Sequence, residues 1–433
     1  MTPADSDSTY PNRQSTSSGG RTLGALGGIA AQGSQAAGSF VLQILAARLL
    51  GLDGLGRFAA LYAIIVLATA LCSGFVGDSL TVLDRSRDDV RAGLQAWLAI
   101  ISLGAGLSCW LGSWILGFLS GPSALAFGGA TVVFLFEDAF RRLLMASLAF
   151  WRIVVVDLAA LASAGVVLVV GAGTFDRLTL THFLIALMFG QIVASIAAML
   201  LIPAAERRLA RHTGPALAAV ASYGVWRSVQ QAVRPTLLAL VRVECLLVVS
   251  TVALGRLEAA RIYVAPALLA VGGISSYLFS SYAARSESPL PNLVRLADRS
   301  VLGLLGAIGA FGAVALLAMS SLGPVLTGGD YELSAVSVAG WVMYAASVAA
   351  VTPYGQLAAV RGRQLAVLGL RVADSVVSFV LVLVVLLFDR SVAWVPVALS
   401  VGSICGGLAI RQIVLRREVA VPLAVAEPTM ETI

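Results

Sequence analysis

Residues 152–172 read RIVVVDLAALASAGVVLVVGA, and Arg152 and Asp157 are the only charged residues in this stretch. A helix that crosses the hydrocarbon core of a bilayer, roughly 30 Å thick, needs about 20 mainly apolar residues. The stretch therefore predicts a membrane-spanning helix.

Similar stretches recur over most of the 433 residues. Hydrophobic residues make up 59% of the chain and charged residues only 12%, and the mean hydropathy is +0.92. Soluble globular proteins are about 25% charged. The composition therefore excludes a soluble enzyme, a disordered protein and a disulfide-stapled secreted module, and it predicts that the chain works inside a membrane.

The lengths of the apolar stretches, and the polar, glycine or proline residues that separate them, predict about twelve helices. We expect them at 22–50, 56–83, 92–119, 124–149, 152–172, 180–203, 224–251, 259–283, 300–322, 334–359, 364–388 and 392–414. The expected fold is an all-α polytopic membrane protein with two six-helix lobes, 22–203 and 224–414. The cytoplasmic linker would be 204–223, the first tail (1–21) would be disordered, and the second tail would be 415–433.

The distribution of arginine predicts the orientation of the chain. All 29 basic residues are arginines, and they concentrate in connections that alternate helices place on one side. Cytoplasmic connections carry such an excess, so both termini are expected in the cytoplasm. The absence of lysine fits a GC-rich coding bias and hence a bacterial cytoplasmic membrane.

No motif for catalysis, metal binding or nucleic-acid binding is present. The four cysteines, which are Cys72, Cys109, Cys245 and Cys405, have no CxxC spacing, so they predict neither a disulfide framework nor a zinc site. HExxH, GxSxG and GxxxxGK[ST] are absent. No basic cluster with interleaved aromatic residues would follow a phosphate backbone. We therefore expect no enzyme, no cofactor and no nucleic-acid partner.

A weak internal repeat supports the division into two lobes. Leu50-Gly51-Leu52-Asp53, followed by Arg57-Phe58, resembles Leu254-Gly255 followed by Glu258, Arg261 and Ile262-Tyr263. Parallel repeats with an even number of helices place a transporter's substrate site between the lobes.

Small residues also mark the turn after the first predicted helix, in Ala47-Arg48-Leu49-Leu50-Gly51 with Gly54 and Gly56-Arg57-Phe58. This hairpin resembles that of polysaccharide-biosynthesis flippases, the Wzx-type oligosaccharide-lipid branch of the MOP superfamily. Further similar positions are Tyr223-Gly224, Glu244, Leu254-Gly255, Tyr263, Ala265, Pro266, Gly328-Gly329-Asp330-Tyr331 and Arg361-Gly362-Arg363. The final loop, Phe388-Asp389-Arg390-Ser391-Val392-Ala393, departs from the Gly-x-x-Gly-Ala-Ala that is common there.

Amides form a stripe on the first predicted helix. Gln32, Gln35, Ser39 and Gln43 are spaced by three or four residues, so they share one face. The stripe predicts either a cavity wall or hydrogen bonds between helices.

The fourth predicted helix carries four charges. Glu137 with Arg141, and Asp138 with Arg142, are i,i+4 pairs with the acid first, which is the favourable order. The four can therefore be structural pairs, or they can handle substrate or protons. Asp157 has no local basic partner beyond Arg152, so Asp157 and Glu137 are candidate sites for a coupling ion, H⁺ or Na⁺. Arg371 and Asp374 are a further possible pair.

The seventh predicted helix gives the strongest functional signal. Arg234 has no acid within four residues, and the acid nearest to Arg242, Glu244, lies on a different face. Unpaired arginine in hydrocarbon costs several kcal/mol, so an anion, an acid from another helix or water should meet it. Guanidinium binds phosphate through forked hydrogen bonds. Arginines and acidic residues are equally numerous inside the predicted membrane-spanning helices, so their numbers alone predict no net charge for a cavity.

These residues and the resemblance together lead to one functional expectation. The protein would be a flippase that moves a lipid-linked oligosaccharide, on an isoprenoid diphosphate as the resemblance implies, by alternating access and as a monomer among membrane lipids. The candidate substrate-binding residues are Arg234, Arg242, Gln32, Gln35, Gln43, Arg141 and Arg142. A multidrug or cation antiporter of the same superfamily is the alternative, and a membrane-embedded glycan polymerase or ligase is a third.

Overall fold

The computed structural model describes residues 18–415, except 205, 209, 211–213, 284, 286 and 287. The predicted tails therefore lie outside the described residues, apart from 18–21 and 415. Everything described is helix or connection: the first half contains α1 (Ser18–Leu49), α2 (Gly51–Cys72), the π-helix η1 (Ser73–Gly77), α3 (Asp78–Val82), α4 (Asp88–Ile115), α5 (Gly121–Ala146), α6 (Phe150–Thr174) and α7 (Leu180–Leu201).

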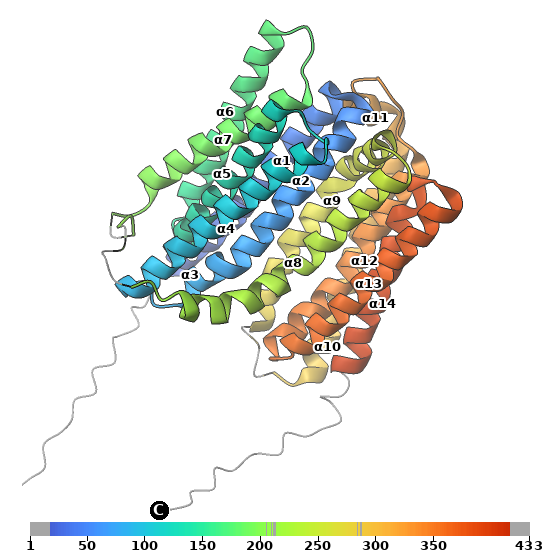
Figure 1. The fold of residues 1–433 in the computed structure, drawn as a ribbon. Coiled ribbons are helices and arrows are strands. Elements are labelled where there is room, and N and C mark those ends of the chain that lie inside the picture. The colour runs from blue at the N-terminus through green and yellow to red at the C-terminus, as the bar shows by residue number, and fades with distance from the viewer. Residues whose placement is uncertain are drawn as a thin grey trace, which may run out of the picture.

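The second half contains α8 (Leu217–Val248), α9 (Thr251–Ala283), α10 (Leu290–Leu317), α11 (Met319–Thr327), α12 (Ala335–Val360), α13 (Gln364–Asp389), the 3₁₀ turn η2 (Val392–Trp394), α14 (Val395–Ala409) and the π-helix η3 (Ile410–Leu415). We call α1–α7 the N-terminal lobe and α8–η3 the C-terminal lobe. Figure 1 shows the two lobes side by side, with their long helices running in roughly the same direction.

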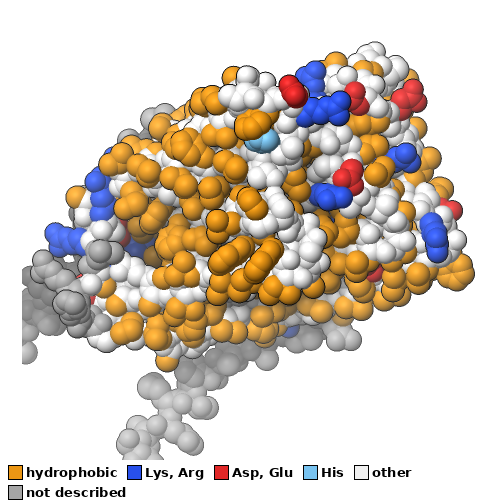
Figure 2. Space-filling view, turned by 45° about the horizontal axis from the view of Figure 1, so that its top comes forward, with side chains coloured by type: hydrophobic (Ala, Val, Ile, Leu, Met, Phe, Trp, Pro, Cys, Tyr) orange, Lys and Arg blue, Asp and Glu red, His pale blue; other side chains and the backbone are white. Residues whose placement is uncertain are grey.

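Ten helical segments of the described residues are long and apolar enough to cross a membrane. Among the remaining helices, α1 and α8 have 32 residues each, and both run the length of the bundle beside these segments. At a rise of 1.5 Å per residue they are also long enough to cross. Gln32, Gln35 and Gln43 of the predicted site lie on α1, and Arg234 and Arg242 lie on α8. The protein is a multi-pass membrane protein, and Figure 2 shows apolar side chains covering most of its flank.

The ends of several helices follow local chemistry. Thr179 and His182 form a capping box at the start of α7, and Ser334 caps α12 by accepting from the amide of Ser337. Gly328 ends α11 in the left-handed conformation, with φ of 71°. These connections place alternate helix ends at the same end of the bundle.

The two ends of the bundle differ in charge. One end carries the connections 83–87, 202–216 and 361–363, and we call it the arginine-rich end because Arg85, Arg87, Arg207, Arg208, Arg361 and Arg363 lie there. The opposite end carries 116–120, 175–179, 249–250 and 328–334. In Figure 1 the arginine-rich end is below, near α3, and the opposite end is above, near α11.

One boundary differs from the prediction in a way that matters for the site. The connection between α8 and α9 contains only Val249 and Ser250, and α9 begins at Thr251 rather than near 259. The prediction was wrong because Ser250, Thr251 and Gly255 resemble the residues of a longer turn. Glu258 therefore lies inside a helix, where it is 1% exposed, and Arg261 lies one turn further on.

Candidate functional site

A cavity of about 190 Å³ lies between the two lobes. Helices α1 and α2 contribute one wall, and α8 and α9 contribute the other. The lining residues are Gln43, Leu55, Phe58, Ala59, Tyr62, Ala63, Val66, Arg234, Pro235, Leu238, Arg242, Glu258, Arg261 and Ile262. Three arginines and one glutamate line it, so the walls carry an excess of positive charge that counting charges along the chain did not predict.

Glu258 organises the polar end of this cavity. Its carboxylate contacts Arg242 at 2.9 Å and Arg261 at 2.5 Å. Arg261 also donates to the side-chain oxygen of Gln43, which ties α9 to α1 across the gap between the lobes. The partner of Arg242 is thus an acid from another helix, which is one of the possibilities left open by the sequence, and it lies on the next helix after the tight turn at 249–250.

Arg234 contacts a tyrosine of α12. Its Nη2 donates to the Tyr344 hydroxyl at 2.5 Å, and its guanidinium carbon lies 5.0 Å from the centre of that ring. No acid of the described chain lies within 4.0 Å of Arg234. A neutral phenol fixes the guanidinium in place without cancelling its charge.

Arg371 lies near Arg234 and adds to the positive charge. Its guanidinium is close enough to repel that of Arg234, and it rests against α12 where Gly355 leaves room: a Cβ there would lie 3.1 Å from Arg371 Nη2. Asp374 is close enough to interact electrostatically with both Arg371 and Arg234, but no ion pair of Arg371 with Asp374 within 4.0 Å is found among the described residues. Asp374 also packs against α14, where a Cβ on Gly406 would lie 2.4 Å from its Oδ2. Spacing along a helix cannot show whether two possible partners approach to ion-pair distance.

A second, smaller cavity of about 70 Å³ lies inside the N-terminal lobe and has room for a few water molecules. Ser34, Gln35 and Ser39 of α1 line it together with Glu137 and Asp157. Of the predicted stripe, Gln35 and Ser39 thus reach this cavity, Gln43 reaches the one between the lobes, and Gln32 is exposed. The stripe is both a cavity wall and a set of interhelical hydrogen bonds.

Arg141 neutralises this second cavity in part. It is 2% exposed, and its Nε lies 3.0 Å from Asp157 Oδ1 but 4.0 Å from Glu137 Oε1. Its Nη2 donates to the carbonyl of Ala31 at 3.0 Å, and Ser34 donates to Asp157 Oδ2 at 2.5 Å. The basic partner of Asp157 thus comes from α5, which the sequence did not indicate. This group of three would carry one net negative charge with both acids ionised.

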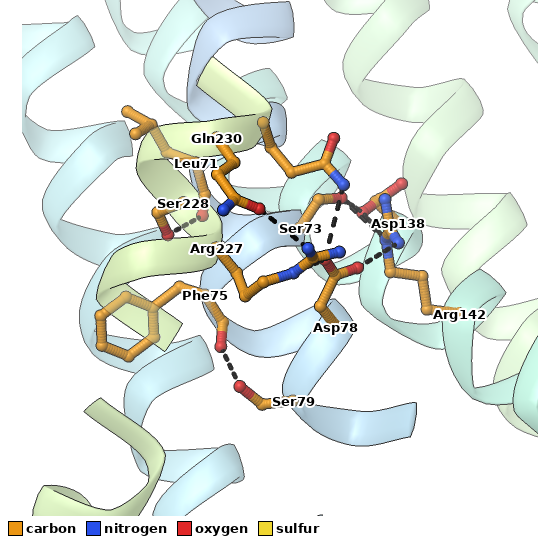
Figure 3. Close-up of polar contacts among 11 residues, drawn as sticks. Leu71, Ser73, Phe75, Asp78, Ser79, Asp138, Arg142, Arg227, Ser228 and Gln230 are labelled. Atoms are coloured by element: carbon orange, nitrogen blue, oxygen red, sulfur yellow. Dashed lines mark hydrogen bonds and ion pairs between the residues drawn. The ribbon is translucent and has the colours of Figure 1, made fainter. Parts of the chain in front are cut away.

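Arg142 points away from that cavity and toward the contact between the lobes. Figure 3 shows it beside Asp138 and Asp78, at 3.1 and 3.5 Å, with Arg227 of the C-terminal lobe 2.7 Å from the same Asp78. Ser73 of η1 accepts from Arg142 at 2.8 Å. The predicted pair of Asp138 and Arg142 is confirmed, and Asp78, which the sequence analysis did not single out, joins the lobes at the arginine-rich end.

Glycines let the lobe backbones approach at both ends of the bundle. At the arginine-rich end a Cβ on Gly74 would lie 2.6 Å from the carbonyl oxygen of Arg227, and a Cβ on Gly224 would lie 2.6 Å from that of Phe75. At the opposite end a Cβ on Gly56 would lie 2.0 Å from the carbonyl oxygen of Thr251. The lobes therefore contact each other on both sides of the cavity between them.

A tyrosine holds α1 at the opposite end. The Tyr331 hydroxyl donates to the carbonyl of Ala47 at 3.2 Å. Burial, with a smaller effect from the charge of Asp330, raises the pKa of Tyr331 to about 12. The hydroxyl therefore remains a donor at physiological pH.

The sequence matches no protein-family model, and no curated protein matches it significantly. Solved structures do match. The fold is similar to that of the lipid II flippase MurJ in an inward closed conformation, with a TM-score of 0.70, 12% identity and coverage of 89% of this chain and 86% of that one.

It is also similar to an inward-facing multidrug resistance MATE family transporter of the MOP superfamily, with a TM-score of 0.68, 12% identity and coverage of 89% and 94%. A third match is a MOP superfamily transporter from Pyrococcus furiosus described by the reverse polarity of its binding pocket, with a TM-score of 0.58, 12% identity and coverage of 92% and 94%. The chain thus has the fold of MOP-superfamily transporters.

Proposed function

We propose that the protein is a flippase that carries a lipid-linked oligosaccharide across the bacterial cytoplasmic membrane for cell-surface polysaccharide biosynthesis. The observation that carries this proposal is Arg234, a guanidinium on the wall between the lobes with a tyrosine hydroxyl but no described acid within 4.0 Å. The Wzx-type branch comes from the sequence resemblance, and the MOP fold supports the superfamily.

The chemistry of the cavity fits an anionic head group. A diphosphate offers several oxygens that can accept forked hydrogen bonds from guanidinium groups. Arg234 provides one such group, and Arg242 can provide another if its pair with Glu258 exchanges. Gln43 can bond sugar hydroxyls from α1, while the lipid tail stays in the membrane outside the lobes.

The size of the cavity supports alternating access. Pockets for drug-sized ligands measure about 300–1,000 Å³, so 190 Å³ is too small for a glycan diphosphate. The lobes would have to separate at one end to admit the head group and at the other to release it. Each end has a contact that such a separation would break, namely the ion pair of Asp78 with Arg227 and the packing of Gly56 on α9.

The alternative is a multidrug or cation antiporter. An exporter of organic cations should present acids to its substrate, whereas the cavity between the lobes presents three arginines and one glutamate that is already paired. This excess of positive charge favours the flippase. A glycan polymerase or ligase is less favoured, because the connections at the opposite end are short.

We place the coupling ion in the second cavity, inside the N-terminal lobe. Glu137 and Asp157 line it, and Arg141 leaves one negative charge there, which a proton or Na⁺ can neutralise. Arg141 and Arg142 are both engaged in ion pairs within the N-terminal lobe, and Arg142 shares Asp78 with Arg227 of the other lobe, so we place them in coupling and closure rather than on the glycan.

A deletion strain tests the proposed function. Loss of the flippase should leave lipid-linked oligosaccharide accumulated on the cytoplasmic side of the membrane, and the wild-type gene should clear it. Hypersensitivity to cationic drugs without such accumulation would favour the exporter instead. A gene encoding Arg234→Gln provides the matched control, because the variant protein should insert in the membrane but fail to clear the lipid.

A further inference from the structure

A third pocket lies outside both cavities described above and shares no lining residue with them. It measures about 340 Å³ and lies at the arginine-rich end of the N-terminal lobe, among η1, α3, α4, α5 and α7. Its lining residues are Val76, Leu80, Arg85, Arg91, Leu94, Gln95, Leu98, Phe136, Ala139, Phe140, Leu143, Met199, Ile202, Glu206 and Arg207. The volume is within the range of ligand pockets.

The depth of the pocket is apolar and the rim is charged. Ten of the lining residues are aliphatic, aromatic or methionine, whereas three arginines, one glutamate and one glutamine form the polar part. Arg85 pairs with Glu206 at 3.2 Å. Arg91 and Arg207 remain as an excess of two positive charges on the rim.

Backbone carbonyls hold these two arginines without neutralising them. Arg91 donates from Nε and Nη2 to the carbonyl of Arg85, at 3.2 and 2.9 Å. Arg207 donates to the carbonyls of Ile202 and Leu200, at 2.6 and 2.5 Å. The guanidinium positions are therefore fixed while their charges stay available to an anion.

Gln95 fixes the connection that closes the pocket. Its amide nitrogen donates to the carbonyl of Arg208 at 3.3 Å, and its side-chain oxygen accepts from the backbone amide of Ala210 at 3.2 Å. Arg208 and Ala210 are thus held against α4, so the pocket is built by the chain rather than left between loosely packed helices.

The surface beside the pocket is suited to lipid. Met199 and Leu200, in the last turn of α7, are 53% and 67% exposed and are continuous with the apolar flank of the bundle. A molecule in the pocket can therefore pass directly into the acyl region of the membrane. Its charged end would meet the arginines where the helices leave the hydrocarbon.

We propose that this pocket binds an anionic membrane phospholipid, with an acyl chain among Leu98, Phe136 and Phe140 and the phosphate against Arg91 and Arg207. The occupant is a resident lipid and is distinct from the transported substrate, because the pocket shares no lining residue with the cavity between the lobes. Binding would join α4, α5 and the connection after α7.

Native mass spectrometry of the delipidated full chain in neutral detergent tests this site. Phosphatidylglycerol should be retained in preference to phosphatidylcholine with identical acyl chains. Replacing Arg91 and Arg207 together by Gln should remove the preference, by about tenfold for each charge-assisted hydrogen bond to the phosphate that the change removes. Arg208→Gln, an exposed arginine on the same connection that does not line the pocket, should leave it unchanged.

A volume change provides a second, independent test. Leu98→Trp should fill the apolar part and reduce retention of both lipids, while Leu103→Trp, which is on the same helix and 59% exposed, should have no effect. Equal retention of the two lipids by the wild type, an unchanged preference in the double arginine variant, or unaffected binding in Leu98→Trp would each overturn the proposal. Transport activity is not the readout, so failure here is separate from failure of the proposed function.

Discussion

Arg234 is the residue whose geometry matters most for the proposed transport. Arg234→Lys keeps one positive charge but loses the forked donors, so transport of lipid-linked oligosaccharide into vesicles should fall about tenfold or more. Transport by the Arg234→Gln variant should fall at least as far. Both proteins should insert and accumulate normally. Full activity of the Lys variant with loss only in the Gln variant would point to simple electrostatics and not to diphosphate geometry.

The buried pair of Arg141 and Asp157 provides a prediction on stability. Asp157→Asn leaves the 2%-exposed Arg141 with only the more distant Glu137, and removing one partner of a buried pair costs about 3–5 kcal/mol. Arg141→Gln with Asp157→Asn removes both charges, so the double variant should be more stable than Asp157→Asn alone. Thermal unfolding in detergent measures this. Additive losses in the double variant would contradict the pairing.

Residue spacing predicts contacts within a helix better than contacts between helices. Asp138 and Arg142 were correctly paired from their i,i+4 spacing, because both stand on one face of α5. Two other ion pairs join different helices, namely Arg242 with Glu258 and Arg141 with Asp157, and spacing along one helix cannot predict such pairs. The sequence therefore indicated candidate residues for the site, whereas the ion pairs that join different helices could be seen only in the structure.

At the scale of elements, the close approach of α2 and α9 rests on two glycines. A Cβ on Gly56 would lie 2.0 Å from the carbonyl oxygen of Thr251, and one on Gly255 would lie 2.0 Å from that of Leu52. Backbone atoms cannot move aside as side chains can. Gly56→Ala or Gly255→Ala should therefore cost about 1–3 kcal/mol and separate the lobes at the opposite end.

Labelling measures that separation. With Cys405, the exposed native cysteine, changed to Ser, a Gln43→Cys reporter in the cavity should react faster with a thiol reagent when Gly56→Ala is present. Gly104→Ala is the matched control, because it lies in α4 with nothing within 4 Å of the added Cβ. An unchanged labelling rate in Gly56→Ala would mean that this contact does not close the cavity.

The elements themselves were largely predictable, and the exceptions have physical causes. Apolar length is a property of each stretch alone, so most predicted spans match a helix within several residues. The π-helix η1 was not predicted, since Ser73–Gly77 has the composition of ordinary apolar helix. Its extra residue per turn lies where Gly74 packs on α8, so its position depends on the other lobe.

For the whole molecule, composition determines more than any motif does. A chain with 12% charged residues and long apolar stretches has to satisfy its backbone hydrogen bonds inside each segment, and only helices do this without pairing to neighbours. The all-helical fold followed from that, and the MOP arrangement is seen in the similar structures. The substrate does not follow from composition, because in our proposal a few arginines between the lobes select it.

The orientation of the molecule decides the direction of the proposed transport. Arg85, Arg207 and Arg361 lie at one end of the bundle, and an excess of arginine marks the cytoplasmic side. Reporter fusions at Ser123, Asp176 and Asp330, all at the opposite end, should read as external. An internal reading at two of the three would reverse the orientation. The ion pair of Asp78 with Arg227 would then close the external end, and the glycine contact of α2 with α9 would close the entrance for substrate.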